Sequence, residues 1–308
     1  MTHLQKLVVV IGATASGKTE AAMAIAHSFD GEVVNADSRL FYRGMDIGTA
    51  KPSRAQLAGV RHHLIDFVEP DQKFSLAQFL KCARKTIADI GGRGKLPVMA
   101  GGTGQYVWGL LEDWQVPEVE PDEELRQELE SVLVDRGVEA LYDRLRQADP
   151  AVAERTDRRN HRRIIRAIER VEAGVKGPAS RGMASKYDAL IIGLNVERAE
   201  LHRRTAERVD LMLARGWLEE TQALLDRGIA PSMPAMSAIG YRELAAHIRG
   251  QMSLELVREK TIHATSRLIR HQNNWFKLAD KRITWVDVTD GNTAKTLEHV
   301  SEWLASRA

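Results

Sequence analysis

Several features that would narrow the function of this chain are scarce in its sequence or missing from it. The 308 residues include one cysteine, Cys82, which excludes an internal disulfide and a metal site built from several cysteines. With so few thiols, a reducing, cytoplasmic setting is the default expectation. Met1–Lys6 has no signal-peptide pattern, and the apolar run Leu7–Ile11 is too short to cross a bilayer. The sequence therefore predicts a cytoplasmic protein with no membrane partner.

An excess of charge of one sign is missing as well. The formal net charge is +2, so binding to a polyanion would have to use a local patch of cations. Zinc-ligand spacing and the G-x-S-x-G elbow are absent, and no heptad repeat suggests an oligomer, so we expect a monomer. The length favours about two domains, and an apolar content of 44% supports a sizeable core.

What the sequence does contain is a phosphate-binding motif close to its start. The octapeptide GATASGKT follows the strand-like run Leu7–Ile11 and precedes the Ala-rich segment Glu20–His27, in the P-loop order of nucleotide- and ATP-binding proteins. Its glycines let backbone N–H groups face a phosphate, and the helix N-terminus adds its positive dipole end. Lys18 supplies a mobile charge, and Thr19 supplies a hydroxyl for Mg²⁺. The predicted phosphate-binding residues are Gly12, Ala13, Thr14, Ala15, Ser16, Gly17, Lys18 and Thr19.

The first hundred residues alternate strand and helix signals, which predicts a mostly parallel sheet covered by helices. The predicted strands are residues 7–11, 32–35, 63–66 and 96–100, and the predicted helices are residues 20–27 and 75–90. In such folds ligands sit at the carboxyl ends of the strands. The P-loop, the pair Asp37-Ser38 and Thr103 all follow such ends.

The composition then changes at the acidic, proline-bearing segment Pro117–Asp122. Residues 123–171 have helical spacing throughout, and Gly174–Tyr187 has the composition of a loop. Strand signals return at 189–194 and 283–288, and the predicted helices of this part are 198–227 (broken at Gly216), 241–249, 254–278 and 293–306. We predict an α/β fold: a P-loop NTPase-like core of residues 1–114 and 187–308 with C-terminal helices, and an inserted all-helical domain of residues 115–186.

Two residues near the predicted strand ends have open interpretations. Asp37 is placed to act as a general base, but the pair Asp37-Ser38 could equally cap a helix. The run Gly101–Gly104 could be only a strand-to-helix turn, or it could bring a ligand close and expose the Thr103 hydroxyl. The pattern alone slightly favours the turn.

Positive charge gathers in two places. The stretch Arg155–Arg170 contains seven arginines and two acidic residues. Because they are spaced by four, one predicted helix face carries Arg158, Arg162, Arg166 and Arg170. The opposite, buried face would carry Ile164, Ile165, Ile168 and Val171. This pattern favours nucleic acid over a solvated surface. Near the C-terminus, Trp275 and Phe276 interleave with cations, which suits stacking on unpaired bases, although Trp275 reads more easily as a core residue.

Together, six segments resemble one family, the bacterial tRNA dimethylallyltransferases, also called tRNA isopentenyltransferases. They are GATASGKT (12–19), NADSRLFYRGMDIGTAKP (35–52), HHLID (62–66), AGGTGQY (100–106), RRIIRAIE (162–169) and AIGYREL (238–244). The resemblance covers nearly the whole chain. It implies transfer of a dimethylallyl group from its diphosphate to the N6 amine of the adenosine 3′ of the anticodon, in tRNAs that read codons beginning with U. The P-loop would then hold the diphosphate of the donor rather than ATP.

The resemblance also implies roles for individual residues. Asp37 would be the general base, Thr103 its positioning partner, and Arg208 part of the clamp on the leaving diphosphate, with Mg²⁺ as cofactor at Thr19. Ser38, Arg39 and Leu40 would line the channel that receives the unstacked base. The remaining positions that the resemblance assigns to the tRNA anticodon stem-loop are Arg126, Arg162, Arg163, Ile164, Ile165, Arg166, Ser237, Ala238, Ile239, Gly240, Tyr241, Arg242, Arg270, His271, Gln272, Trp275 and Lys277.

The chain departs from the family pattern mainly in segments that would contact RNA. Thr156–Asn160 replaces the usual Ile-His-Pro-Asn-Asp, and Ser266 and His271 each stand where the family favours arginine. Ala13 replaces a usual proline in the P-loop, and Gln105 stands where leucine is common. These changes bear on tRNA range and affinity more than on the transfer chemistry.

Two other functions fit parts of the sequence. A small-molecule or nucleoside kinase would need a metal-binding acid after a core strand, and Met99–Gly101 has none. An RNA-binding module with a relic P-loop would explain the arginine stripe but would leave Asp37 and Thr103 without a task.

Overall fold

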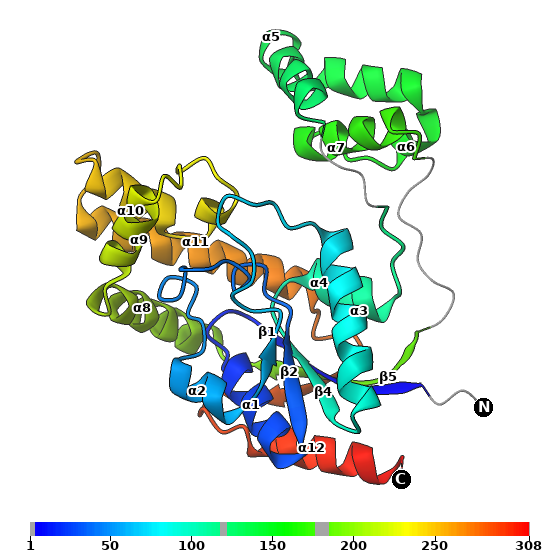
Figure 1. Cartoon of the computed structure of the whole chain (residues 1–308), viewed down its shortest axis with the longest axis vertical. Helices are drawn as coiled ribbons and strands as arrows, with labels where there is room; N and C mark the ends of the chain where they lie inside the picture. Colours follow the sequence, from blue (N-terminus) through cyan, green and yellow to red (C-terminus); the bar gives the residue numbers. More distant parts are fainter. Residues whose placement is uncertain (1–3, 118–121, 176–184, 308) are drawn as a thin grey trace. The chain divides into compact units, whose positions relative to one another are not determined.

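The structure is a computed structural model that describes residues 4–117, 122–175 and 185–307 (Figure 1). It divides into two compact units, one formed by Met1–Glu112 with Ala184–Ala308 and the other by Asp113–Met183. The predicted linker Pro117–Asp122 and the predicted loop Gly174–Tyr187 lie largely outside the described residues.

The first unit is built on a six-stranded sheet in which every neighbouring pair of strands is parallel, as the sequence predicts. The strand order is β3-β2-β4-β1-β5-β6. The strands are β1 (Gln5–Gly12), β2 (Gly31–Asn35), β3 (His62–His63), β4 (Leu96–Ala100), β5 (Tyr187–Asn195) and β6 (Ile283–Asp287).

The register of the sheet brings three strand ends together. Ala100 of β4 pairs with both Val10 of β1 and Asn35 of β2. The segments that follow these strands therefore leave the sheet side by side at its carboxyl edge. This edge carries the P-loop, Asp37 and Thr103.

Helices cover both faces of the sheet. Val8 and Val10 of β1 share an apolar core with α1 (Lys18–Ser28) and α12 (Ala294–Ala305), while α3 (Leu76–Gly92) packs on β1, β2 and β4. Because side chains alternate along a strand, the equally buried Val9 points to the face opposite Val8 and Val10.

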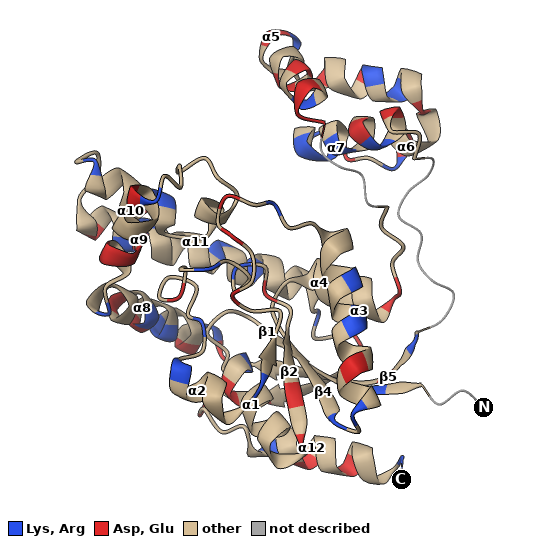
Figure 2. Ribbon diagram, viewed as in Figure 1, with Lys and Arg blue, Asp and Glu red and all other residues tan. Residues whose placement is uncertain are grey.

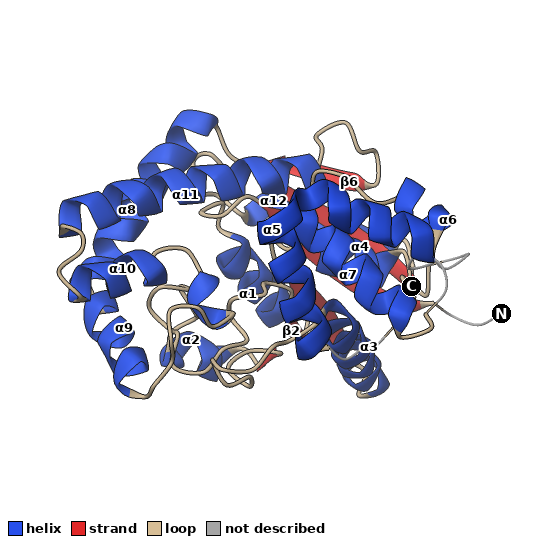
Figure 3. Ribbon diagram, turned by 90° about the horizontal axis from the view of Figure 1, so that it is seen from above, coloured by secondary structure: helices blue, strands red, loops and turns tan. Residues whose placement is uncertain are grey.

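A second group of helices in this unit packs mainly against itself (Figure 3). It comprises α8 (Arg198–Ala214), α9 (Trp217–Asp226), a 3₁₀ turn (Ala235–Ser237), α10 (Tyr241–Ile248) and α11 (Leu254–Trp275). The predicted break at Gly216 is confirmed, since this glycine has φ = 96° and is the N-cap residue of α9. Left-handed backbone of this kind strongly favours glycine.

Two details of the sequence prediction are wrong. The third strand covers only His62–His63, because Leu64 and Asp66 adopt positive φ values of 56° and 57° and turn the chain away. The short helix α2 (Arg54–Gly59) was not predicted, although Ser53 and Gln56 form a capping box at its start. Helix α4 (Gly104–Leu111) follows the glycine run and packs beside α3.

The second unit is helical: α5 (Glu123–Ala148), α6 (Pro150–Glu154) and α7 (His161–Glu172). Gly137, at φ = 81°, breaks α5 into two segments. Acidic and basic positions both occur along these helices (Figure 2). The apolar core consists of Leu125, Leu129, Leu141, Tyr142, Leu145, Ala153, Ile164, Ile165, Ala167 and Ile168. No helix within the described residues of either unit combines the length and apolar character of a membrane span.

Candidate functional site

The P-loop forms a tight turn between β1 and α1. A Cβ at Gly12, where φ is 153°, would come within 2.7 Å of Ser16 Oγ and 2.9 Å of the Leu194 carbonyl oxygen. Gly17 precedes α1 in left-handed backbone, at φ = 88°. The Lys18 ammonium folds back over the loop and donates to the Ala13 carbonyl oxygen at 2.7 Å. The two glycines therefore give the loop the shape that the motif predicts.

Three charged side chains act on one another at this edge of the sheet. Burial lowers the pKa of Lys18 to about 8, although Asp37 raises it, and Arg208 of α8 lowers it further. Burial also lowers the pKa of Arg208, again against the effect of Asp37. The carboxylates of Asp37 and Glu20 raise the pKa of both cations, but burial outweighs them, and such a place favours an added anion.

Asp37 is held by its own backbone and by Asn35, the last residue of β2. The Asn35 side chain accepts from the Asp37 N–H at 2.8 Å and donates to the Asp37 carbonyl at 3.0 Å. The Asp37 Oδ1 accepts from the Arg39 N–H at 2.9 Å. The turn uses one carboxylate oxygen and leaves Oδ2 available to a ligand.

Thr103 lies beside Asp37 because β2 and β4 end together. Its Oγ1 accepts from the Ser38 N–H at 3.3 Å, and its N–H donates to the Ala36 carbonyl at 3.4 Å. A Cβ at Gly101 would lie 2.2 Å from the Ala36 carbonyl oxygen, so only glycine allows this approach. The glycine run is thus a turn, and it also brings the Thr103 hydroxyl to Asp37's segment.

A cavity of about 160 Å³ opens at this place within the first unit. Its polar wall includes Thr14, Asp37 and Arg208. Its other lining residues are Arg39, Gly48, Thr49, Thr205, Val209, Met212, Trp217, Ser237, Ala238, Ile239, Thr261, Thr265 and Leu268. The cavity therefore joins a charged end to an apolar wall that comes largely from α8, α9 and α11.

Gln272 of α11 lies against the P-loop. Its side chain is 4% exposed, and its Oε1 accepts from the Thr14 N–H at 2.8 Å and from the Thr14 hydroxyl at 3.2 Å. The family resemblance assigns Gln272 to the RNA-contacting residues, and the structure gives its side chain a partner in the phosphate-binding loop. The sequence shows only a polar residue at a buried position of a helix, and this does not identify its partner.

The other residues assigned to the stem-loop in this unit differ in exposure. Tyr241 and Ala238 are buried. Arg242 is exposed and donates to the Pro231 carbonyl oxygen at 3.0 Å. The Arg39 guanidinium donates to Ser237 Oγ at 3.0 Å. Ser38, Leu40 and Ile239 are half-buried. Among the assigned residues at the end of α11 and just beyond it, Arg270, His271, Trp275 and Lys277 are exposed.

The expectation that Trp275 is a core residue is wrong. Its side chain is 39% exposed, while its neighbour Phe276 is 2% exposed. Trp275 packs closely over Gly104, where a Cβ would lie 2.2 Å from the indole ring.

In the helical unit the arginines that the resemblance assigns to tRNA, Arg126 of α5 and three of α7, fall into two groups. Arg162 and Arg163 are exposed and form no ion pair with the described part of the chain. Arg126 and Arg166 instead bind the buried Glu169, at 2.6 and 3.2 Å. Ile164 and Ile165 are core residues, as the helix periodicity predicts, so their side chains do not face a partner.

A metal site made by protein carboxylates does not stand out. No group of three His, Cys, Asp or Glu side chains that could hold an ion occurs in residues 4–117, 122–175 and 185–307. The Thr19 hydroxyl, at the first turn of α1, is the ligand that the P-loop motif provides.

Two family models match the chain. The IPP transferase model matches residues 40–279, and the isopentenyl transferase model matches residues 5–69. A tRNA dimethylallyltransferase of Thermomicrobium roseum is 44% identical over 94% of this chain and 88% of that protein. Another, of Desulforudis audaxviator, is 42% identical over 94% of each chain.

Solved structures agree with these relatives. The tRNA isopentenylpyrophosphate transferase of Bacillus halodurans superposes with a TM-score of 0.73 at 37% identity, over 98% of this chain and 96% of that one. A eukaryotic dimethylallyltransferase described as acting on tRNA gives a TM-score of 0.82 at 25% identity, over 98% of this chain and 80% of that one. With one family model covering most of its length and relatives this similar along nearly all of it, the chain belongs to the IPP transferase family.

Proposed function

We propose that this chain transfers a dimethylallyl group from dimethylallyl diphosphate to the N6 amine of the adenosine 3′ of the anticodon, in tRNAs that read codons beginning with U. The names of its relatives supply the reaction class. The observation that carries the proposal is the cavity itself, which brings Thr14 of the P-loop, Asp37 and Arg208 to one place. We further propose that the chain acts in the cytoplasm as a monomer.

The charged end of the cavity would hold the diphosphate. Lys18, Arg208 and the P-loop N–H groups are the donors, and the charge on the leaving diphosphate grows as the C1–O bond breaks. Cations that are already desolvated stabilise this developing charge without much rearrangement. The lowered pKa of Lys18 supports such a role, since the bound anion would restore its full protonation.

Mg²⁺ fits this arrangement as a partner of the diphosphate. Mg²⁺ keeps several waters and is usually bound through one or two protein groups together with substrate phosphates. A single hydroxyl, Thr19, matches that donor set better than a cage of carboxylates would. Bound there, the ion would neutralise charge on the diphosphate; the residues that hold and orient the two substrates are those of the chain.

Asp37 is the proposed general base. The N6 nitrogen attacks C1 of the dimethylallyl group, the C1–O bond breaks, and diphosphate leaves. The nitrogen must also lose a proton, and Asp37 Oδ2 can accept it because Oδ1 is occupied by the Arg39 N–H. Thr103 would orient the same segment through its contact with Ser38.

The apolar wall would receive the five-carbon chain. Val209 and Met212 follow Arg208 on the same side of α8, and Trp217 and Ile239 continue the lining. A chain attached to a diphosphate at Arg208 could therefore lie on these side chains and keep water from C1.

The helical unit, residues 115–186 in the predicted division, is the proposed second contact to tRNA. The exposed Arg162 and Arg163 would bind phosphates of the stem, while Arg270, His271 and Lys277 would do so from the first unit. The exposed ring of Trp275 could stack on an unpaired base.

The test is transfer of labelled dimethylallyl diphosphate to an anticodon stem-loop in the presence of Mg²⁺, followed by mass analysis of the nucleosides. We expect prenylated adenosine next to the anticodon. An unmodified stem-loop that is still bound by the protein would contradict the proposed reaction.

A further inference from the structure

One motif has no task in the reaction described so far. The run MDIGTAKP, residues 45–52, belongs to a segment that carries the family resemblance, yet it contains none of the proposed catalytic groups. Its segment Asp46–Thr49 reaches the cavity, because Gly48 and Thr49 form part of the lining. Contacts from Glu220 and Lys51 hold this loop in place.

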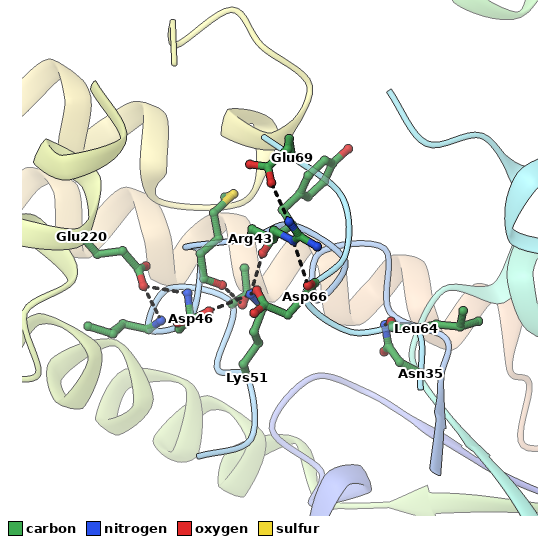
Figure 4. A network of polar contacts seen from close by, with 12 residues as sticks. Asn35, Arg43, Asp46, Lys51, Leu64, Asp66, Glu69 and Glu220 are labelled. Carbon is green, nitrogen blue, oxygen red and sulfur yellow. Dashed lines mark hydrogen bonds and ion pairs between the residues drawn. The ribbon is translucent and has the colours of Figure 1, made fainter. Parts of the chain in front are cut away.

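Glu220 of α9 binds the loop through three consecutive N–H groups. The carboxylate accepts from Asp46 at 2.6 Å, from Ile47 at 2.7 Å and from Gly48 at 3.1 Å (Figure 4). Its Oε1 also accepts from the Tyr241 hydroxyl at 2.6 Å. Hydrogen bonds to an ionised acceptor are about twice as strong as neutral ones, so one carboxylate fixes four donors firmly.

Lys51 secures the other end of the same loop. Its side chain is 4% exposed, and its ammonium donates to Asp46 and Asp66 carboxylates at 2.6 Å each and to the Tyr42 carbonyl at 2.5 Å. Figure 4 shows Lys51 between the two aspartates, with Glu220 on the far side of Asp46. The loop is therefore held from two sides.

The same contacts enclose a large side chain of the cavity wall. A Cβ at Gly48 would lie 1.9 Å from the Trp217 Nε1, and a Cβ at Gly240 would lie 2.1 Å from the opposite part of the indole. The Tyr241 ring packs edge-on against Trp217, with centroids 5.6 Å apart. Trp217 thus sits between two glycines, and both neighbouring segments are bonded to Glu220.

The Tyr241 phenol is suited to stay a donor in this arrangement. Burial raises its pKa well above the usual value, and the Glu220 charge raises it further. The hydroxyl remains protonated across the working range of pH and keeps its hydrogen bond to the carboxylate. Tyr241, assigned by sequence to the stem-loop, thus contacts α9 inside the protein.

We propose that Glu220 is a positioning residue that sets the apolar wall of the donor pocket: it fixes Asp46–Gly48 and Tyr241, and through them the indole of Trp217. This rests on the proposed function, in which the five-carbon chain lies on that wall. Glu220 does not touch the donor. It determines how well the wall fits the apolar chain, while the P-loop determines how well the diphosphate binds.

The test compares two ligands that differ only by the five-carbon chain. Binding of dimethylallyl diphosphate and of inorganic diphosphate is measured by calorimetry for the wild type, Glu220→Gln and Tyr241→Phe. The Glu220→Gln amide keeps one acceptor oxygen, but its NH₂ group is a donor and would face N–H groups that now bind a carboxylate oxygen. We expect its Kd for dimethylallyl diphosphate to rise about tenfold, with the Kd for diphosphate changed less than about twofold. Tyr241→Phe removes one of the four bonds, and we expect a smaller rise of about threefold for the same ligand alone.

The neighbouring Glu219 is the matched control, because it is exposed on the same helix. Glu219→Gln should bind both ligands as the wild type does. Equal weakening of both ligands by Glu220→Gln, or a lower melting temperature with both Kd values unchanged, would overturn the proposal. Because binding is measured without RNA, absence of prenyl transfer by the wild type would refute the proposed function separately.

Discussion

The cations at the carboxyl edge of the sheet and those of α7 belong to the same residue types but stand in different surroundings. Burial removes hydration from Lys18 and Arg208 and lowers the pKa of both, although the nearby Asp37 carboxylate raises both values. Arg162 and Arg163 are exposed on the helical unit, with no ion pair to the described residues. Each group suits a polyanion in a different way.

A desolvated cation binds one anion in one orientation, and salt screens it little. An exposed arginine binds any nearby phosphate, and its contribution falls as salt rises. We therefore expect Lys18 and Arg208 at the sheet edge to bind and orient the diphosphate. We expect Arg162 and Arg163 of the helical unit to attract RNA phosphates without a fixed orientation. Four changes, taken from the largest expected effect to the smallest, test whether donor binding and RNA binding are separated in this way.

Asp37→Asn should cause the largest loss, because it removes the proposed base at the centre of the charged cluster. The amide can still accept from the Arg39 N–H, so the turn should persist. We expect kcat to fall about 10²–10⁴-fold, the range for general-base catalysis, with donor binding at pH 7 retained. Single-turnover transfer to a stem-loop measures it, and a rate within a few-fold of the wild type would remove Asp37 from this role.

Donor binding should weaken as the pH rises above about 8, where Lys18 loses its proton. The bound diphosphate favours the charged form, so binding takes up a proton, and the Kd rises up to about tenfold per pH unit. The pKa of Lys18 is lowered from 10.5 to about 8, so the charged lysine lowers the free energy of unfolding below pH 8. This loss of stability decreases as the pH rises from 8 toward 10.5.

The control for this pH dependence is Lys18→Arg, whose guanidinium stays charged over the same range. Calorimetry between pH 7.5 and 9.5 should give a flat profile for the variant. Stem-loop binding should change less with pH than donor binding does, because Arg162, Arg163 and Arg270 stay charged over this range. A slope that persists in Lys18→Arg would show that another group is responsible.

Arg162→Gln combined with Arg163→Gln should weaken RNA binding without affecting the donor. Each lost phosphate contact lowers the slope of log K against log salt by about 0.7–0.9, so the pair should lower it by about 1.5. Titration of a labelled stem-loop at several salt concentrations measures the slope. An unchanged slope would mean that this face is only solvated.

Arg126→Gln should have the smallest effect on activity and act on stability instead. It removes one of the two arginines bound to the buried Glu169. Leaving part of a buried charged group unpaired costs about 1–3 kcal/mol, which thermal unfolding would detect. The salt slope of RNA binding should stay that of the wild type; a loss equal to one phosphate contact would show that Arg126 meets RNA directly.

The sequence predicts the parallel sheet and the position of the P-loop well, because the apolar runs and glycines that form them are local. It also predicts the buried face of α7 through Ile164 and Ile168. It does not predict the contacts of Glu220 and Gln272, which join residues 172–174 and 258 positions apart in the chain. Such pairs depend on tertiary packing, and an isolated polar residue in a helix gives no sign of its partner.

The same limit explains the errors. The apolar residues of HHLID suggest a longer strand, but positive φ values at Leu64 and Asp66 end it. Trp275 follows a helical pattern that suggests burial, yet its ring lies over Gly104 and stays partly exposed. The pattern of apolar residues predicts neither the backbone turn after His63 nor the packing of Trp275 on Gly104.

The contact between Gly102 and Gln272 limits how this protein can change by mutation. A Cβ at residue 102 would lie 2.2 Å from the Gln272 Nε2, and Gln272 is itself bonded to Thr14 of the P-loop. A side chain at position 102 would therefore displace the Gln272 amide, and that movement would break its hydrogen bonds to Thr14. Mutations at positions 102 and 272 are thus coupled through the P-loop.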